Sequence, residues 1–182
     1  LDSIRIREGR GVSQALEYLL SLGHRKIGYL GEYSSDIRYQ KFCALMEEHG
    51  LTVNPAFVRC GAERFERGGY LRAMELFEQK ELPTAILVGY DQMAYGVLRA
   101  CRERGIRVPE DLSIVGFDDI VMDDYFPVAL TSVSYPMEQM GTVAVQILMD
   151  AIENPKTHVV QNVALQTKLA VRGSACPPAS SE

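Results

Sequence analysis

Four side chains suited to ligand recognition follow short apolar runs in this sequence. Arg38 can donate two parallel hydrogen bonds to vicinal hydroxyls or to a carboxylate. Asp118 can accept hydrogen bonds from a neutral polyol, and Tyr90 and Phe65 can stack on the apolar face of a ring. Arg38 could instead be a solvated helix charge and Phe65 ordinary core. Because Arg38, Tyr90 and Asp118 follow separate apolar runs, we expect them to converge on one recognition pocket.

Signatures of reactive chemistry are missing from the sequence. A phosphate-binding loop requires GxGxxG or GxxxxGK[ST] directly after a strand, and the segment GEYSSD after Leu30 fits neither pattern. No GxSxG elbow offers a nucleophile for acyl transfer. The histidines lack HExxH or HxH spacing, and we interpret them as surface or capping residues: His24, His49 and His158. The sequence therefore predicts no catalytic role.

Acidic residues and cysteines leave a metal site open as an alternative. The pairs Asp118-Asp119 and Asp123-Asp124 could hold a hard cation such as magnesium, but no basic residue or phosphate loop accompanies them. The cysteines lack CxxC spacing, and we interpret them as buried or incidental thiols of a reducing cytoplasm: Cys43, Cys60, Cys101 and Cys176. We predict neither a metal nor a cofactor.

The elements that must position these side chains recur at intervals of roughly thirty residues, the length of a βαβ unit. The apolar runs predict strands at Lys26–Leu30, Phe57–Cys60, Ala85–Gly89 and Ser113–Phe117. Parallel strands can be joined only through a crossover, so this rhythm predicts an α/β fold, a parallel sheet flanked by helices on both faces. Such sheets bind small molecules at the carboxyl ends of their strands.

Helical periodicity fills the segments between the strands. Apolar residues three and four apart, with glycine or proline at the ends, predict helices over 10–22, 36–50, 66–79, 91–105 and 136–154. A short strand, LTSV, precedes the last helix, and the segment 159–171 predicts one or two strands.

Composition narrows the class of protein further. The 182 residues include 47% hydrophobic residues, enough for a core, and the formal net charge of -5 disfavours nucleic-acid binding by this segment alone. Neither a signal peptide nor a membrane-length apolar run is present, which favours a cytoplasmic location. A start at Leu1 suggests a fragment.

Longer stretches of the chain indicate a protein family more specifically than composition does. The segments LGHRKIGYLG, PTAILVGYDQMAYG, GIRVPEDLSIVGFDD, YFPVALTSV, PMEQMG and VRGS resemble the effector-sensing region of the lactose-repressor/galactose-repressor family of transcription regulators. The resemblance runs in order from about Ser3 to Ser174. It implies a periplasmic-binding-protein type I fold with two α/β lobes, and a DNA-binding helix-turn-helix head that precedes this segment.

The resemblance also implies how the chain divides between the lobes. Residues 1–24 would end the first lobe, 25–130 would form the second lobe, 131–157 would be a crossover with a first-lobe helix, and 158–174 would return to the second lobe. We expect 175–182 to be a disordered tail. Because the helices 10–22 and 136–154 would lack most of the sheet they cover, we expect an exposed apolar surface or self-association if the chain begins at Leu1.

Site residues carried over by the resemblance match those chosen above. Arg38 lies at an effector-contacting arginine, Asp118 at an acceptor for ligand hydroxyls, and Arg64 or Phe65 at an aromatic stacking position. Tyr90 replaces a common asparagine, which favours stacking. Arg7-Glu8 replaces a frequent Asp-Asn pair, and with Arg10 also near the cleft, an anionic effector becomes a hypothesis.

The function implied is effector sensing by a homodimer that reaches DNA only through a separate head and has no membrane partner. Contacts between subunits would come from the helix after residue 91 and the loop that follows the fourth strand: Met93, Tyr95, Val97, Tyr125 and Phe126. Core packing is the alternative for Met93 and Val97. The alternative function is an extracytoplasmic solute-binding protein of the same fold, feeding a transporter or chemoreceptor.

Overall fold

The computed structural model describes residues 1–33, 37–120 and 128–179. Its main body is a six-stranded sheet in the order β3-β2-β4-β5-β6-β8. The strands are β2 (Ile27–Gly31), β3 (Val58–Cys60), β4 (Ala85–Val88), β5 (Ser113–Phe117), β6 (Thr131–Ser134) and β8 (Lys168–Ala170). All neighbours are parallel except β6 and β8. The predicted α/β class and the four predicted strands are confirmed.

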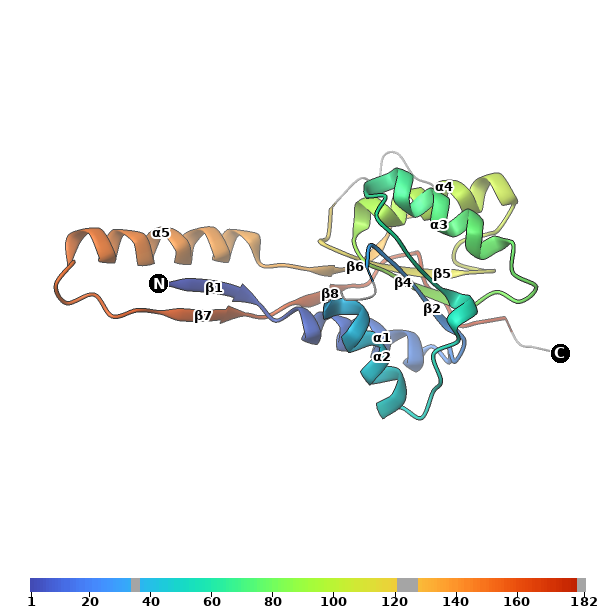
Figure 1. The fold of residues 1–182 in the computed structure, drawn as a ribbon, viewed down its shortest axis with the longest axis horizontal. Coiled ribbons are helices and arrows are strands. Elements are labelled where there is room, and N and C mark those ends of the chain that lie inside the picture. The colour runs from blue at the N-terminus through green and yellow to red at the C-terminus, as the bar shows by residue number, and fades with distance from the viewer. Residues whose placement is uncertain (34–36, 121–127, 180–182) are drawn as a thin grey trace.

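Helices cover both faces of this sheet (Figure 1). One face carries α1 (Glu8–Ser21) and α2 (Ile37–Glu48), and the other carries α3 (Phe65–Phe77) and α4 (Asp91–Arg104). Each pair of helices forms its own apolar core with the sheet. β2, β4 and β5 are buried along their whole length, as parallel strands covered on both sides must be.

The helices α3 and α4 pack at unusually close range because glycines face each other across their contact. A Cβ on Gly69 would lie 1.9 Å from the Met93 carbonyl oxygen, and one on Gly96 would lie 1.9 Å from that of Glu66. No larger residue fits at either position without separating the helices. This contact fixes the beginnings of both helices next to one another.

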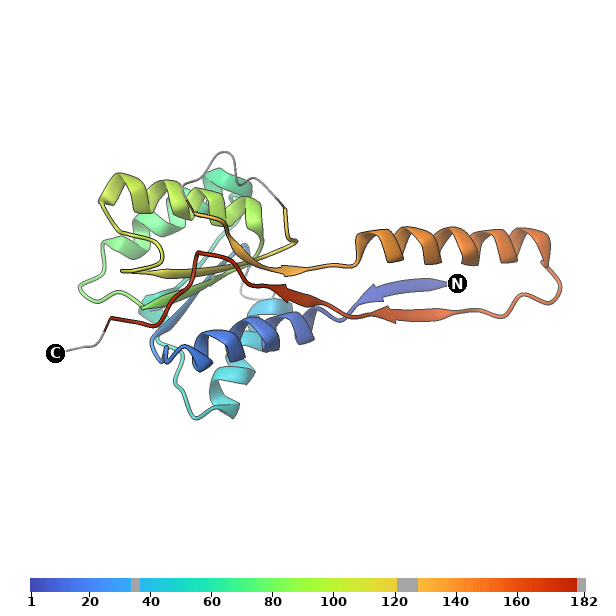
Figure 2. The same cartoon turned by 180° about the vertical axis from the view of Figure 1, so that it is seen from behind.

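A second part of the molecule extends from the body as an arm (Figures 1 and 2). It consists of β1 (Ser3–Ile6), α5 (Met137–Glu153) and β7 (Asn162–Leu165), with β1 and β7 paired in parallel. At its tip, His158 bonds Asp150 at 2.7 Å and Asp2 at 3.0 Å. In this structure the helix α5 exposes large apolar side chains: Met137, Val145, Leu148, Met149 and Ile152. The expected exposure of the helix 10–22 is wrong, because the apolar stripe of α1 is buried.

The boundaries between the two parts differ from the prediction. The helix α1 was assigned with β1 to the first 24 residues, but Val12, Leu16 and Leu19 pack into the core of the six-stranded sheet. The segment 158–174 is likewise divided, since β7 pairs with β1 in the arm whereas β8 pairs with β6 in the body. An amphipathic pattern shows that a face is buried but not against which partner.

The expectation of a disordered tail over 175–182 is wrong for the first residues of this segment. The carbonyl oxygen of Cys176 accepts hydrogen bonds from His24 at 2.9 Å and from the Ser113 hydroxyl at 3.1 Å. The backbone amide of Ile114 donates to the Ser174 carbonyl oxygen at 2.7 Å. The segment after β8 is therefore bound along the edge of β5. Residues 180–182 lie outside the described part of the chain.

Candidate functional site

A polar cleft of about 390 Å³ opens where β2, β4 and β5 end. Its lining comes from six separate segments, and the residues are Glu8, Glu32, Arg38, Arg64, Phe65, Tyr90, Gln92 and Asp118. Glu32 follows β2, Tyr90 lies between β4 and α4, and Asp118 follows β5. The parallel sheet brings these positions together because its strands all end at one edge.

Arg38 is held by several partners on one side of the cleft. Its guanidinium donates to the Gly89 carbonyl oxygen, to the Tyr135 hydroxyl at 2.9 Å and to Glu8 Oε1 at 3.4 Å. The same group lies 4.9 Å from the centre of the Phe117 ring. Arg38 is therefore a positioned cation that joins α2 to α1 and to the residues directly after β4 and β6, rather than a solvated helix charge.

Tyr90 and Glu32 organise the opposite side. The Tyr90 hydroxyl donates to Glu32 Oε1 at 2.7 Å and accepts a hydrogen bond from the Phe65 amide at 2.9 Å. Arg64 Nε donates to the same Glu32 oxygen at 2.8 Å. Burial raises the pKa of Glu32, but the hydrogen bonds from Tyr90 and Arg64 outweigh it and hold the pKa below its usual value. Glu32 is thus an ionised hub.

Phe65 presents an aromatic surface to this cleft. Its side chain is 50% exposed, and its ring meets that of Tyr90 edge to face with centroids 6.2 Å apart. The backbone φ of 57° places Phe65 in the left-handed region, which is rare for a large residue. The Arg64 guanidinium lies 4.9 Å from the centre of the ring. The part of the ring that Arg64 does not cover is available for stacking on a ligand.

Asp118 supplies a carboxylate at the end of β5. Burial raises its pKa, and the nearby charge of Arg38 offsets that rise only in part. Its φ is 97° and that of Asp119 is 57°, so two consecutive residues adopt left-handed conformations. Among the described residues, no side-chain hydrogen bond occupies the Asp118 carboxylate, which leaves it able to accept one from a ligand.

The structure thus brings together five of the six predicted effector-binding residues: Arg38, Arg64, Phe65, Tyr90 and Asp118. The sixth, Arg10, is exposed on α1 and is absent from the lining. Sequence reasoning missed Glu32 and Gln92, and it noted Glu8 only as half of the Arg7-Glu8 pair. The rule that ligands bind beyond strand ends could have found Glu32, which directly follows β2.

The residues predicted to contact a second subunit do not lie on a described surface. Met93 and Val97 are fully buried in the core between α3, α4 and the sheet, and Tyr95 is 4% exposed. This burial favours the core-packing alternative for these side chains. Tyr125 and Phe126 lie outside the described residues.

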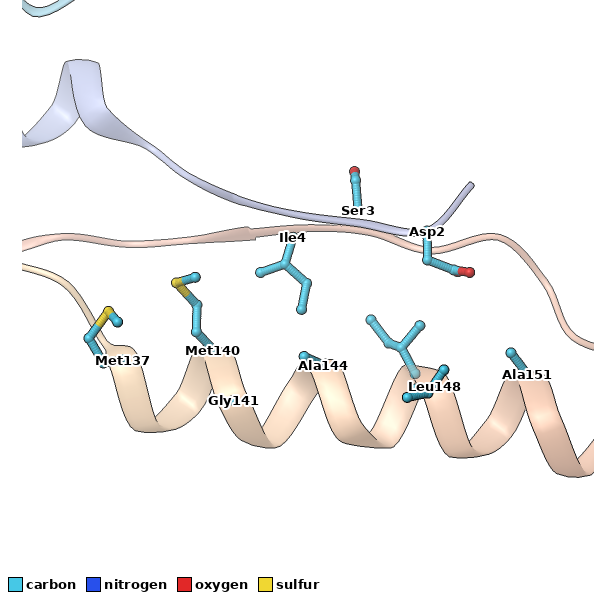
Figure 3. Close-up of a pocket in the computed structure, with 10 residues that line it drawn as sticks. Asp2, Ser3, Ile4, Met137, Met140, Gly141, Ala144, Leu148 and Ala151 are labelled. Atoms are coloured by element: carbon cyan, nitrogen blue, oxygen red, sulfur yellow. The ribbon is translucent and has the colours of Figure 1, made fainter.

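A larger groove of about 590 Å³ lies in the arm, between α5 and β1 (Figure 3). Ile4 points toward the helix, and Met140 and Ala144 face it from α5 (Figure 3). The groove is lined mainly by apolar groups and carries none of the polar side chains that converge at the strand ends. Over the described residues, no group of three metal-ligating side chains gathers in either place.

Comparison with known proteins agrees with this architecture. A family of periplasmic binding protein-like domains matches residues 16–175. This chain belongs to that family. It is 37% identical over 166 residues to the HTH-type transcriptional repressor PurR of Haemophilus influenzae (strain PittEE), covering 88% of this chain and 49% of that protein.

Solved structures of LacI-family regulators share the fold. A ribose-bound regulator from Enterococcus faecium matches with a TM-score of 0.84 and 26% identity over 97% of this chain and 66% of that one. The regulator CelR in complex with cellobiose matches with a TM-score of 0.83 and 28% identity over 96% of this chain and 54% of that one. The chain spans about half the length of the curated relatives it matches. Across its described residues, no helix has the length and apolar character needed to cross a membrane.

Proposed function

We propose that this chain is the effector-sensing part of a LacI-type transcription regulator and that the cleft at the strand ends binds a sugar or related metabolite. One observation carries the proposal: acceptors, donors and an exposed aromatic ring from separate segments line a single polar cleft. Two of the structural relatives were solved with ribose and with cellobiose, which supports a polyhydroxylated ligand.

The charges of the cleft favour a neutral ligand over the anionic effector considered from sequence. Both lining arginines already have carboxylate partners, Arg38 in Glu8 and Arg64 in Glu32. Asp118 adds a third carboxylate, so the lining carries one net negative charge. An incoming phosphate or carboxylate would have to displace an existing ion pair, whereas a hydroxyl can donate to Asp118 at once.

The position of the cleft suggests how occupancy becomes a signal. All the lining residues belong to the body, but Glu8 begins α1 two residues after the end of β1, where the arm joins the body. A ligand that contacts Glu8 stabilises one arrangement of arm and body over another, by its difference in affinity for the two. In the whole protein, a homodimer would pass this change to a separate helix-turn-helix head on DNA, in the cytoplasm.

The alternative is an extracytoplasmic solute-binding protein with the same fold. The relatives described as transcriptional repressors favour the regulator. The sequence upstream of this segment separates the two, since a signal peptide there would favour the solute-binding protein and a helix-turn-helix would favour the regulator. We assign no catalytic role in either case.

Calorimetric titration with D-ribose, cellobiose and ribose 5-phosphate tests the proposal. We expect a neutral sugar to bind and the phosphate to bind at least about tenfold more weakly. Replacing Asp118 with alanine should weaken sugar binding by at least about tenfold, the effect of losing one hydrogen bond to a charged group. Arg38→Ala should also remove binding, while Glu153→Ala, an exposed change on α5, should not.

Unchanged sugar affinity in both Asp118→Ala and Arg38→Ala would remove the cleft from consideration. Because Arg38 also holds neighbouring groups, Phe65→Ala provides a milder third variant at an exposed side chain. Tighter binding of the phosphate than of the sugar would restore the anionic hypothesis.

A further inference from the structure

Asp91 is a buried carboxylate placed directly behind the cleft. It is 1% exposed and is the first residue of α4. Tyr90 and Gln92, its neighbours in sequence, both line the cleft, but Asp91 does not. A carboxylate in this position cannot touch a ligand in the cleft, so its burial requires another explanation.

Both oxygens of Asp91 accept hydrogen bonds from the opposite side of the sheet edge. Ser132 Oγ donates to Oδ1 at 2.7 Å, and the Ile120 amide donates to Oδ2 at 2.8 Å. Ser132 Oγ in turn accepts a hydrogen bond from the Asp119 amide at 3.1 Å. Asp91 therefore holds two consecutive amides after β5, one directly and one through Ser132.

These two amides belong to the turn that presents Asp118 to the cleft. Left-handed conformations at consecutive non-glycine residues persist only where the surroundings enforce them. The Tyr95 hydroxyl donates to the Ile120 carbonyl oxygen at 2.7 Å, and Arg172 pairs with Asp119 at 2.5 Å. The turn is thus fastened to α4 through Asp91 and Tyr95 and to the segment after β8 through Arg172.

The sheet is shaped to admit this carboxylate. A Cβ on Gly116 would lie 2.1 Å from Asp91 Oδ1, so only glycine at this position of β5 leaves room for it. Burial raises the pKa of Asp91 to about 7, although the hydrogen bonds from Ser132 and Ile120 lower it, and the charges of Asp118 and Asp119 raise it. Because burial of a carboxylate is unfavourable, the position of Asp91 is explained by the hydrogen bonds that it accepts, which fix the backbone around it.

We propose that Asp91 is a positioning residue for effector binding: its carboxylate fixes the strained turn that aims Asp118 into the cleft. The expected consequence of this inference, a change in the affinity for effector, rests on the proposed function. Its structural basis, the pair of anchored amides, can be tested without any ligand.

Amide hydrogen exchange followed by ¹⁵N NMR on the 182-residue chain tests the anchoring. In Asp91→Ala, the Asp119 and Ile120 amides should exchange at least about tenfold faster, since both lose their anchor. In Ser132→Ala, only the Asp119 amide should accelerate. The amide of Asp118 donates to the Val133 carbonyl oxygen at 2.9 Å and is the internal control that should change little.

Asp91→Asn is the matched control, because asparagine can accept from Ile120 and donate to Ser132 Oγ. It should keep both amides within about threefold of the wild-type exchange rate. Ser132→Ala keeps the test decisive if Asp91→Ala does not fold. An Ile120 amide that accelerates in Ser132→Ala as much as Asp119 does would overturn the proposal, as would equal acceleration of Asp118, Asp119 and Ile120 in every variant.

Affinity for D-ribose and cellobiose provides the second readout. Asp91→Ala, which loses both hydrogen bonds, should bind these sugars at least about tenfold more weakly than the wild type does. Asp91→Asn should bind them with an affinity within about threefold of the wild-type value. Wild-type affinity in Asp91→Ala with both amides released would refute the positioning role. If neither sugar binds the wild type, the proposed ligand class fails, while the exchange pattern still decides whether Asp91 holds the turn.

Discussion

Replacing Gly116 with alanine should destabilise the protein through Asp91 rather than through the strand itself. The added Cβ would lie 2.1 Å from Asp91 Oδ1 and 3.0 Å from Leu130 Cδ2. Carbon and oxygen in ordinary contact are well over 3 Å apart, so the carboxylate must move by about 1 Å or more. Because the site is buried, the displaced carboxylate stays away from water and loses its hydrogen bonds.

The expected magnitude follows from those bonds. Each hydrogen bond to a charged group contributes about 1.5–3 kcal/mol, and two are lost. Burial of one methyl group returns about 0.8 kcal/mol, and the stiffer unfolded chain returns about 0.4–1 kcal/mol. We therefore expect Gly116→Ala to lower the free energy of unfolding by about 1–5 kcal/mol, a substantial part of the 5–15 kcal/mol of an ordinary domain.

Urea denaturation at pH 8, followed by far-ultraviolet circular dichroism, measures this change. Gly173→Ala is the matched control, since a Cβ there would meet its nearest atoms at 3.7 and 3.9 Å. A double-mutant cycle isolates the cause, because Gly116→Ala should cost much less in a chain that already carries Asp91→Ala. Equal stability of Gly116→Ala and Gly173→Ala, or the same cost of Gly116→Ala in both backgrounds, would refute the reasoning.

Other predictions concern the arm and the thiols. Hydrogen bonds to Asp150 and Asp2 raise the pKa of His158, so the stabilisation from protonated His158 is complete below its ordinary pKa and is lost as pH rises through the raised value. The difference in melting temperature between wild type and His158→Gln should therefore shrink from pH 6 to pH 9. A difference that stays constant over this range would contradict the reasoning. Burial raises the pKa of Cys101 to about 12, so iodoacetamide at pH 8 should leave it unmodified in peptide mapping until the protein is denatured. A Cβ on Gly141 in α5 meets nothing within 4 Å, so Gly141→Ala should stabilise that helix by up to about 1 kcal/mol in thermal unfolding, and a loss of stability would show that the glycine is needed there.

Much of the fold could be predicted from sequence because its signals are local. The apolar runs at 85–89 and 113–117 are buried strands, and Gly105 ends α4 in a left-handed conformation, as a helix-stopping glycine should. The site was partly predictable for a related reason: parallel strands share an edge, so Tyr90 and Asp118 had to lie near each other.

Tertiary structure alone decided which surfaces the amphipathic helices cover. The apolar stripe of α1 predicted a buried face, yet only the folded chain shows that this face packs on the six-stranded sheet while α5 lies in the arm. The partners of Arg38 and Asp91 were equally hidden, since Glu8 is 30 residues from Arg38 and Ser132 is 41 residues from Asp91. Periodicity is set by neighbours along the chain, whereas the choice of a distant partner depends on the path of the whole backbone.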